Sequence, residues 1–334
     1  MAIAMDQNIY AWKRFWCNWE GNYLLTDDGY LLDPEVEPYG YRSPDVVSFQ
    51  DISHNHCLVL LGEPGIGKTS AIKMEEKLIN SKNEISGSKA LRIDLNQISS
   101  SSDFTEILFD SETIQDWISS EYPLHIFLDS LDECPLRINR LCTMLSSRLK
   151  NYPIERLYLR IACRTADWQR LQIIFKTELK GIYDNFGVYE LLPLRRLDVY
   201  NAAKTNGIDP DFFLSDIADR DAGPMAARPV TLKFLLDTYG SNKKIPYEKI
   251  DLYFEGCKFL CMESNENRKA SKDTGNLSWD QRFMVAARIA ALTMFSKKDA
   301  VVCDERVNIK NNEIKIYSLY GGKEYIKEVE FVRV

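Results

Sequence analysis

The stretch CLVLLGEPGIGKTS, residues 57–70, constrains the fold of this chain more than any other part of the sequence. An apolar run leads into a glycine-rich turn and then into an amphipathic segment. The pattern G-x-x-x-x-G-K-[ST] is satisfied by Gly62, Gly67, Lys68 and Thr69. The alternative is a chance match in an ordinary strand-turn-helix, but the apolar run before the pattern and the amphipathic segment after it favour a phosphate-binding loop.

The residue types of this loop suit an anion. Glycines let the backbone curl so that successive N–H groups point at phosphate oxygens, and the helix that follows presents its positive end to the same anion. We expect Lys68 to reach the β- and γ-phosphates and the Thr69 hydroxyl to bind Mg²⁺. The predicted nucleotide-contacting residues of the loop are Gly62, Glu63, Pro64, Gly65, Ile66, Gly67, Lys68, Thr69 and Ser70.

Bulk composition excludes several classes of protein. The 334 residues suffice for about two or three domains, and an apolar fraction of 45% provides ample core. A net charge of −7 argues against a dedicated nucleic-acid binder. No signal peptide is visible and no apolar run approaches the ~20 residues of a membrane span, so we expect a cytoplasmic protein with no membrane partner. The 8 cysteines are scattered and the chain has only 3 histidines, so buried thiols are favoured over a zinc site.

Strands and helices alternate after residue 57, which predicts βαβ units and a mainly parallel sheet with helices on both faces. After residue 194 the pattern is helical, and the last stretch, residues 313–334, alternates like a β-strand pair. The predicted strands are 57–61, 90–95, 124–128, 157–163 and 187–192, and the predicted helices are 104–119, 136–149, 199–205, 211–219, 251–263 and 279–295, with a further helix beginning near Pro229 and a loop at 99–102.

These patterns divide the chain into four parts. Residues 1–53 are an aromatic-rich lead-in that we expect to pack on the domain that follows, because so many tryptophans are costly to expose. Residues 54–193 form the predicted P-loop nucleotide-binding domain, and residues 194–245 a helical lid. Residues 246–334 form a helical, winged-helix-like region that ends in β-strands. The apolar end of this last part indicates a chain that is cut off or abuts a partner.

A second stretch, HIFLDSLDEC at residues 125–134, contains the acids that nucleotide hydrolysis needs. Asp129 follows four apolar residues, and an acid at the end of a strand beside the phosphate loop can hold Mg²⁺. A nearby acid, Asp132 or Glu133, can orient or deprotonate the attacking water. The alternative is a solvated acidic loop.

The run IFLDSLDE resembles the Walker B motif of NACHT proteins, in the STAND branch of the AAA+-related ATPases. This resemblance implies that Asp129 is the magnesium-associated acid and that Asp132 or Glu133 is catalytic, with Glu133 favoured. LRIACRTADW resembles the sensor-1 strand of the same family, which would put Arg164 at the γ-phosphate, although a surface salt bridge is the alternative. AARPVTLKFLL resembles the lid motif whose proline touches the nucleotide, so Pro229 is a candidate, or simply a first-turn helix proline.

The resemblance extends over residues 52–295 and implies a bacterial NACHT-type module like those of antiphage defence proteins. It implies ATP and Mg²⁺ as cofactors, slow hydrolysis, and nucleotide-dependent self-association in response to a protein trigger. No histidine follows His125, so the winged-helix histidine of many relatives is absent. The rival interpretations are an AAA+-like remodelling ATPase acting on nucleic acid or protein, and a regulatory module that binds nucleotide without turnover. No guanine signature Asn-Lys-x-Asp is present, which favours ATP over GTP.

Overall fold

The computed structural model of the chain describes residues 12–36, 44–81, 87–134, 136–179, 182–183, 186–242, 244–262, 278–298, 300–302 and 313–315. These residues form two compact units, divided between Lys244 and Ile245. In the described part of the chain, no helix is long and apolar enough to cross a membrane.

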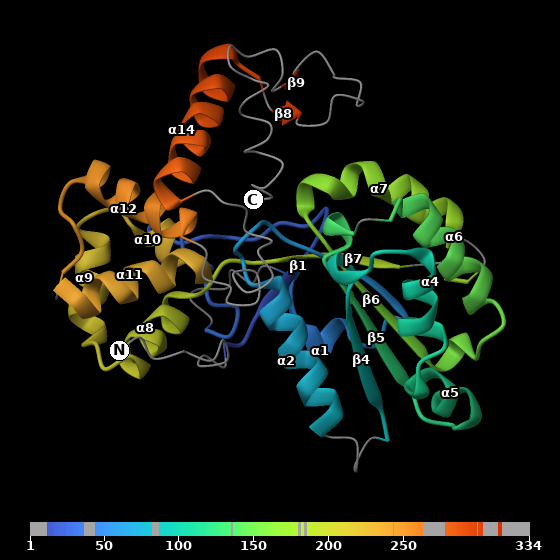
Figure 1. Cartoon of the computed structure of the whole chain (residues 1–334). Coiled ribbons are helices and arrows are strands. Elements are labelled where there is room, and N and C mark those ends of the chain that lie inside the picture. Colours follow the sequence, from blue (N-terminus) through green and yellow to red (C-terminus); the bar gives the residue numbers. More distant parts are fainter. Residues whose placement is uncertain are drawn as a thin grey trace. The chain divides into compact units, whose positions relative to one another are not determined.

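A seven-stranded sheet is the base of the first unit, with the strand order β2-β1-β7-β3-β6-β5-β4 (Figure 1). The strands from β3 to β7 run parallel to their neighbours, whereas β1 is antiparallel to both β2 and β7. This mainly parallel α/β sheet confirms the predicted fold class. The strand bounds are Phe15–Asn18 (β1), Val46–Ser48 (β2), Cys57–Leu61 (β3), Lys89–Asp94 (β4), Leu124–Asp129 (β5), Leu157–Cys163 (β6) and Gly187–Leu191 (β7).

Helices cover both faces of the sheet, which explains why its central strand, β3, is apolar throughout. Leu58 and Leu60 of β3 pack on the face that carries α1 and α2, while Val59 and Leu61 point into the larger core beneath α5, α6 and α7 (Figure 1). The bounds of these helices are Phe49–Ile52 (α1), Lys68–Ser81 (α2), Ser101–Phe104 (α4), Glu112–Ser119 (α5), Ile138–Leu149 (α6) and Thr165–Glu178 (α7).

The single helix predicted over residues 104–119 is wrong, and so is the loop at 99–102. Ser100 and Asp103 form a reciprocal capping box, so a helix already begins inside the serine run. A π-helical turn over Thr105–Phe109 ends this first helix. Ser111 then caps α5 by accepting a hydrogen bond from the backbone N–H of Ile114. Ser100 and Ser111 each cap a helix, so the segment forms two helices instead of one.

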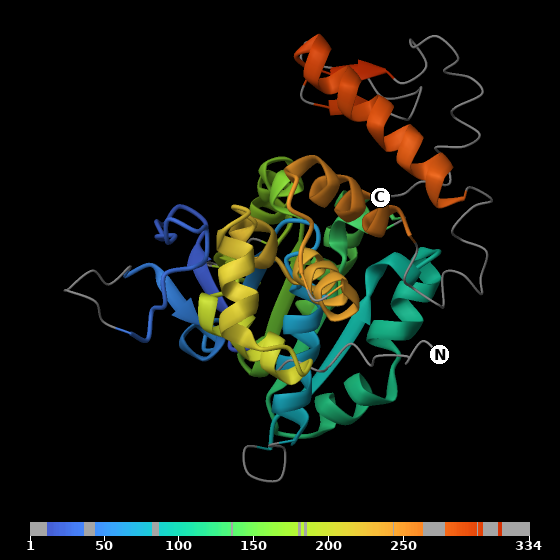
Figure 2. The same ribbon diagram turned by 90° about the vertical axis from the view of Figure 1, so that its left-hand side faces the viewer.

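The lead-in extends the sheet with two strands that the sequence pattern does not predict. Phe15 and Trp16 of β1 are 5% and 1% exposed, and Trp16 contributes to the core on the α1–α2 face. The loop after β1 lies against the helices that follow the sheet (Figure 2), where a Cβ at Gly223 would lie 1.9 Å from the carbonyl oxygen of Asp28. The lead-in thus packs on both the sheet and these helices.

Residues 192–195, which we call the hinge, connect β7 to a set of four helices in the first unit. The backbone N–H of Leu194 donates to the carbonyl oxygen of Ala227, and the N–H of Leu31 donates to the carbonyl oxygen of Leu194. The four helices, which we call the lid, are Arg196–Thr205 (α8), Pro210–Ala218 (α9), Gly223–Ala226 (α10) and Pro229–Asn242 (α11). The helix predicted near Pro229 therefore begins at that residue.

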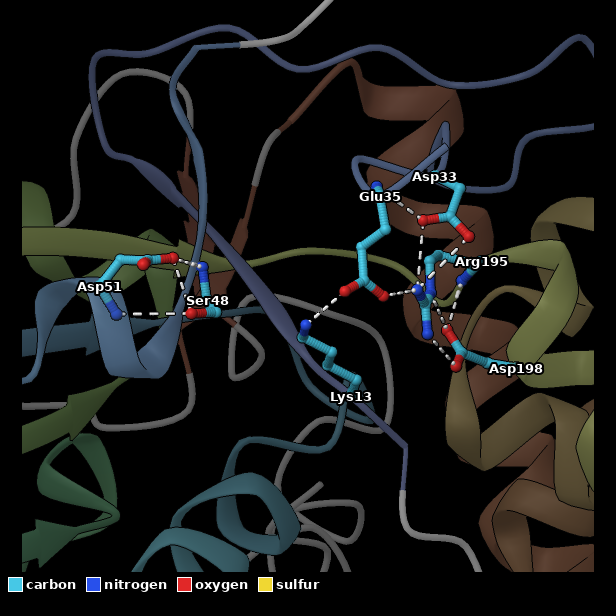
Figure 3. A network of polar contacts seen from close by, with 7 residues as sticks. All are labelled: Lys13, Asp33, Glu35, Ser48, Asp51, Arg195 and Asp198. Atoms are coloured by element: carbon cyan, nitrogen blue, oxygen red, sulfur yellow. Dashed lines mark hydrogen bonds and ion pairs between the residues drawn. The ribbon is translucent and has the colours of Figure 1, made fainter. Parts of the chain in front are cut away.

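A buried ion network anchors the end of the hinge to the lead-in (Figure 3). Arg195 is 5% exposed and its guanidinium forms ion pairs with Asp33, Glu35 and Asp198 at 3.2, 2.8 and 3.0 Å. Lys13 pairs with the other oxygen of Glu35. Burial alone would lower the pKa of Arg195, but the hydrogen bonds and charge of these acids raise it above its ordinary value. The guanidinium therefore stays charged and bound to all three acids.

The second unit contains helices α12 (Lys249–Cys261) and α14 (Trp279–Ser296) and the parallel strands β8 (Ala300–Val302) and β9 (Glu313–Lys315). Phe254 of α12 and Phe283 of α14 contact each other edge to face, with ring centroids 5.1 Å apart. Most of the predicted β-like ending lies outside the described residues. Cys257 is exposed on α12, which corrects the expectation of buried thiols at that position.

Replacement of Gly223 by alanine should destabilise the first unit. Because the new Cβ would lie 1.9 Å from the Asp28 carbonyl oxygen, backbone must shift. We expect the free energy of unfolding in urea to fall by about 1–3 kcal/mol. Gly240→Ala is the matched control, because Gly240 lies in α11 with open space around its Cβ, and there stability should rise by about 0.5–1 kcal/mol. Equal effects of the two substitutions would contradict the packing of the lead-in on the lid.

Candidate nucleotide-binding site

The phosphate-binding loop spans residues 62–67, between the end of β3 and the start of α2. Gly65 and Gly67 have φ angles of 75° and 94°, in the left-handed region that side chains rarely adopt. At Gly62, a Cβ would lie 2.9 Å from Cγ2 of Ile66. The three glycines are therefore required by the conformation of the loop itself.

Lys68 begins α2 and turns its ammonium back over the loop. The Nζ donates to the carbonyl oxygen of Gly62 and lies 3.5 Å from that of Glu63. Burial lowers the pKa of Lys68, and the negative charge of Asp132 acts in the opposite direction. The ammonium thus lies at the loop, close to Asp132 and Asp129 at the end of β5.

Thr69 and Asp129 meet although 60 residues separate them in the sequence. The Thr69 hydroxyl donates to Oδ1 of Asp129 at 3.4 Å, because β3 and β5 end at the same edge of the sheet on either side of β6. Asp129 is 1% exposed, and among the described residues its Oδ2 has no hydrogen-bond partner, with Nη1 of Arg92 at 3.8 Å. Burial and then the charge of Asp94 raise the pKa of Asp129.

This pair of oxygens fits the predicted Mg²⁺. A hydroxyl and a carboxylate are the hard ligands that Mg²⁺ prefers, and one or two protein ligands suffice when phosphate and water complete the octahedron. The free Oδ2 of Asp129 is buried and its charge is poorly compensated, so a divalent cation would supply what the carboxylate lacks. Thr69 and Asp129 are thus well placed for the metal role that the sequence assigns to them.

Arg164 bridges the two remaining acids. It lies at the start of α7, just after β6, where its backbone N–H donates to Oδ1 of Asp132 at 3.0 Å and its Nε lies 2.7 Å from Oδ2. Its Nη2 donates to Oε1 of Glu133 at 2.6 Å. Asn96, after β4, lies 3.5 Å from the other oxygen of Glu133. Arg164 therefore forms ion pairs with both acids that follow β5, while its own side chain is 30% exposed.

Asp132 and Glu133 differ in solvent exposure and in how tightly Arg164 holds them. The Asp132 side chain is 6% exposed and both its oxygens contact Arg164, and burial raises its pKa while Arg164 acts against that rise. The Glu133 side chain is 34% exposed. A water molecule can reach Glu133 more readily, which favours Glu133 as the base and Asp132 as the residue that orients Arg164.

The lid contacts the loop directly. The backbone N–H of Val230 lies 3.4 Å from the carbonyl oxygen of Gly65, and Arg228 forms an ion pair with Glu63 at 2.9 Å. Pro229 Cγ would lie 3.3 Å from a Cβ at Gly67. Pro229 therefore adjoins the loop as well as beginning α11.

Four residues of this site were not foreseen from the sequence, namely Arg14, Arg92, Asp94 and Asn96. Asp94 is paired in register with Asp129 across the sheet, so strand pairing would have located it and Asn96 had the register been known. Arg92 lies on the same strand, β4. Arg14 lies in no recognisable motif. It donates a hydrogen bond to the carbonyl oxygen of Ile66 in the loop, and it is placed there by the pairing of β1 with β7.

No protein-family model matches the sequence, and no curated protein matches it. Among solved structures, the chain is similar to the ORC2 protein of Aeropyrum pernix, with 11% identity, a TM-score of 0.41 and coverage of 75% of this chain and 72% of that one. It is similar to the RuvB Holliday junction branch migration motor of Thermotoga maritima, with 16% identity, a TM-score of 0.35 and coverage of 72% and 76%. For Hsp104 with ATPγS and FITC casein, the values are 13%, 0.36, 73% and 48%. Similarity at this level says nothing about activity, so function is argued from the residues of this chain.

Replacement of Asp129 by asparagine should stabilise the metal-free chain at neutral pH. A carboxyl whose pKa is raised by folding favours the protonated form, so it begins to oppose folding as the pH rises above its unfolded-state pKa and opposes it fully above its folded-state pKa. In EDTA at pH 7.5, we expect Asp129→Asn to raise the free energy of unfolding by about 1 kcal/mol, and the gain should shrink as the pH falls towards 4.

Urea unfolding at several pH values measures this difference. Asp27→Asn, on the exposed loop after β1, is the control and should change stability by less than about 0.5 kcal/mol at every pH. A loss of stability in Asp129→Asn at pH 7.5 would show that the carboxylate is already compensated without a cation.

Proposed function

We propose that this chain binds Mg-ATP and hydrolyses it slowly. The observation that carries the proposal is the meeting of Thr69, at the first turn of the helix after a glycine-rich loop, with the buried Asp129 at the end of β5. The loop N–H groups and the ammonium of Lys68 then lie near the carboxylate of Asp129, whose negative charge is poorly compensated. Such a site suits a triphosphate with its divalent cation.

Each residue has a role in this proposal. Loop N–H groups bind the phosphates, Lys68 leaves the loop carbonyls to bind the β- and γ-phosphates, and Thr69 and Asp129 hold Mg²⁺. When bound, Mg²⁺ would neutralise charge on the phosphate oxygens. Glu133 accepts a proton from the attacking water, and Arg164 stabilises the charge that develops on the γ-phosphate.

The ion pair between Arg164 and Glu133 supports slow turnover. The Oε1 oxygen of Glu133 already accepts a hydrogen bond from Nη2 of Arg164 at 2.6 Å, so in this arrangement the two groups occupy each other. Arg164 must exchange Glu133 for the γ-phosphate before both groups can act. The same ion pair favours a second candidate, a regulatory module that holds nucleotide without turnover.

The finer proposal is a NACHT- or STAND-type switch in which the lid responds to the bound nucleotide and changes self-association, as in antiphage defence modules. Support comes from the IFLDSLDE run and from the contacts of Val230 and Arg228 with the loop. Because the lid and the loop are in contact, a ligand that displaces the loop also biases the lid.

Phosphate release from ATP by the purified chain tests the proposal, with bound nucleotide identified by mass. We expect Lys68→Ala to lose nucleotide and turnover together. Glu133→Gln should retain ATP while its turnover falls by about 100-fold, since general-base catalysis contributes at least that factor. Lys77→Ala, an exposed lysine on the same helix, should behave as the wild type.

The possible outcomes separate the candidates. Nucleotide that stays bound to the wild type without turnover would favour the regulatory module, and acceleration by added DNA would favour a remodelling ATPase. A wild-type chain that binds no nucleotide would refute the proposal as a whole.

Removal of the Arg164 guanidinium should also slow turnover. We expect Arg164→Ala to slow phosphate release by about 100-fold, the usual effect of losing one group that stabilises transition-state charge. Binding of ADP should be unchanged, because ADP has no γ-phosphate. Faster turnover in Arg164→Ala would mean that the ion pair with Glu133 only inhibits.

A further inference from the structure

Arg14 joins the phosphate-binding loop to the hinge. This residue lies in the lead-in, just before β1, and its Nη1 donates to the carbonyl oxygen of Ile66 at 2.9 Å. Its Nη2 donates to the carbonyl oxygen of Leu192 at 2.7 Å. The two acceptors belong to the loop and to the hinge, so one rigid guanidinium spans both.

The hydrogen bond to Ile66 fixes the direction of the next amide. In a planar trans peptide the carbonyl oxygen of one residue and the N–H of the next point in opposite directions. By holding the Ile66 oxygen, Arg14 therefore turns the N–H of Gly67 the other way. That N–H belongs to the loop whose amides are expected to bind phosphate.

Space around Gly67 is filled from both sides. A Cβ there would lie 2.9 Å from Nη1 of Arg14 and 3.3 Å from Cγ of Pro229. The lead-in and the lid thus close on the same residue of the loop. A side chain at this position would meet both Arg14 and Pro229, so the two segments share the space beside Gly67.

Charge compensation at Arg14 comes from dipoles. Burial lowers the pKa of Arg14 to about 10, and the charge of Asp198 acts in the opposite direction. Asp198 already binds Arg195 through its side chain, and the partners that the described residues give Arg14 are two backbone carbonyls. Arg14 is half-buried, and its two hydrogen bonds offset the cost of taking its charge partly out of water.

We propose that Arg14 is a positioning residue of the nucleotide site, which sets the Gly67 amide for phosphate and couples the loop to the hinge of the lid. The inference rests on the proposed nucleotide binding but adds a residue that does not itself touch the ligand. A change in the loop that displaces the Ile66 carbonyl oxygen also displaces Arg14 from Leu192. Ligand binding in the loop then changes the conformation of the hinge, and with it that of the lid, through the single side chain of Arg14.

Two measurements test this role. The first is the affinity of the full chain for ADP and for AMP-PNP in the presence of Mg²⁺. We expect Arg14→Gln to weaken both by the same factor, about tenfold, because the loss of a charge-assisted hydrogen bond disturbs the loop and not one phosphate. Arg14→Lys should weaken both nearly as much, since one ammonium cannot reach two diverging carbonyls.

The second measurement is amide hydrogen exchange in the nucleotide-free chain. In Arg14→Gln, exchange should quicken about tenfold in residues 62–67 and 192–195 together and stay unchanged in β5 and β6. Lys150→Gln is the control. It removes an exposed lysine between α6 and β6, which belongs to neither the loop nor the hinge, and it should change neither affinity nor exchange by more than about twofold.

Several results would overturn the inference. If AMP-PNP loses more affinity than ADP, or if Arg14→Lys restores binding fully, then Arg14 acts as a charge on phosphate and not through the backbone. Faster exchange in the loop without faster exchange in the hinge would remove the coupling. A wild-type chain that binds no nucleotide would refute the proposed function, while the exchange experiment would still decide whether Arg14 joins the loop and the hinge.

Discussion

Parallel strands bring their carboxyl ends to one edge of a sheet, and the site of this chain depends on that constraint. Thr69 follows β3, Asp129 ends β5 and Arg164 follows β6, and because β6 lies between β3 and β5 all three reach the same place. The ordering needs both faces of the sheet to be covered, which the apolar strand residues achieve with helices on either side. The parallel sheet that buries the apolar strand residues therefore also brings Thr69, Asp129 and Arg164 together.

Much of this arrangement could be predicted from local sequence. The strand at Cys57–Leu61 is found at its predicted bounds, because a strand that is buried on both faces reads as an uninterrupted apolar run. The loop glycines could be identified because their φ angles admit few other residues, and Pro229 because its ring fits a first helical turn. In each case, the local structure requires a particular residue type, and that residue type is visible in the sequence.

The remainder depends on contacts between distant parts of the chain. The strands β1 and β2 have only four and three residues, too short for a pattern, and they exist because β7 offers an open edge. Arg14 and Asp94 belong to the site only through strand register, which no local signal contains. The pair of Arg164 with both acids was likewise not predicted, because the geometry that aims one guanidinium at two carboxylates arises from tertiary packing.

The antiparallel pairing of β1 with β7 also bears on how the protein is made. The strand β1 pairs with β7, the last strand of its sheet, about 170 residues later in the chain. While the ribosome produces the intervening residues, β1 can pair with β2 on one side, but its other edge has no partner, and such exposed edges invite aggregation. The parallel strands can assemble in order, but the edge closes only when residue 191 has emerged. A nascent chain therefore joins its lead-in to the hinge late, when β7 completes the sheet and Trp16 and Leu191 enter the same core.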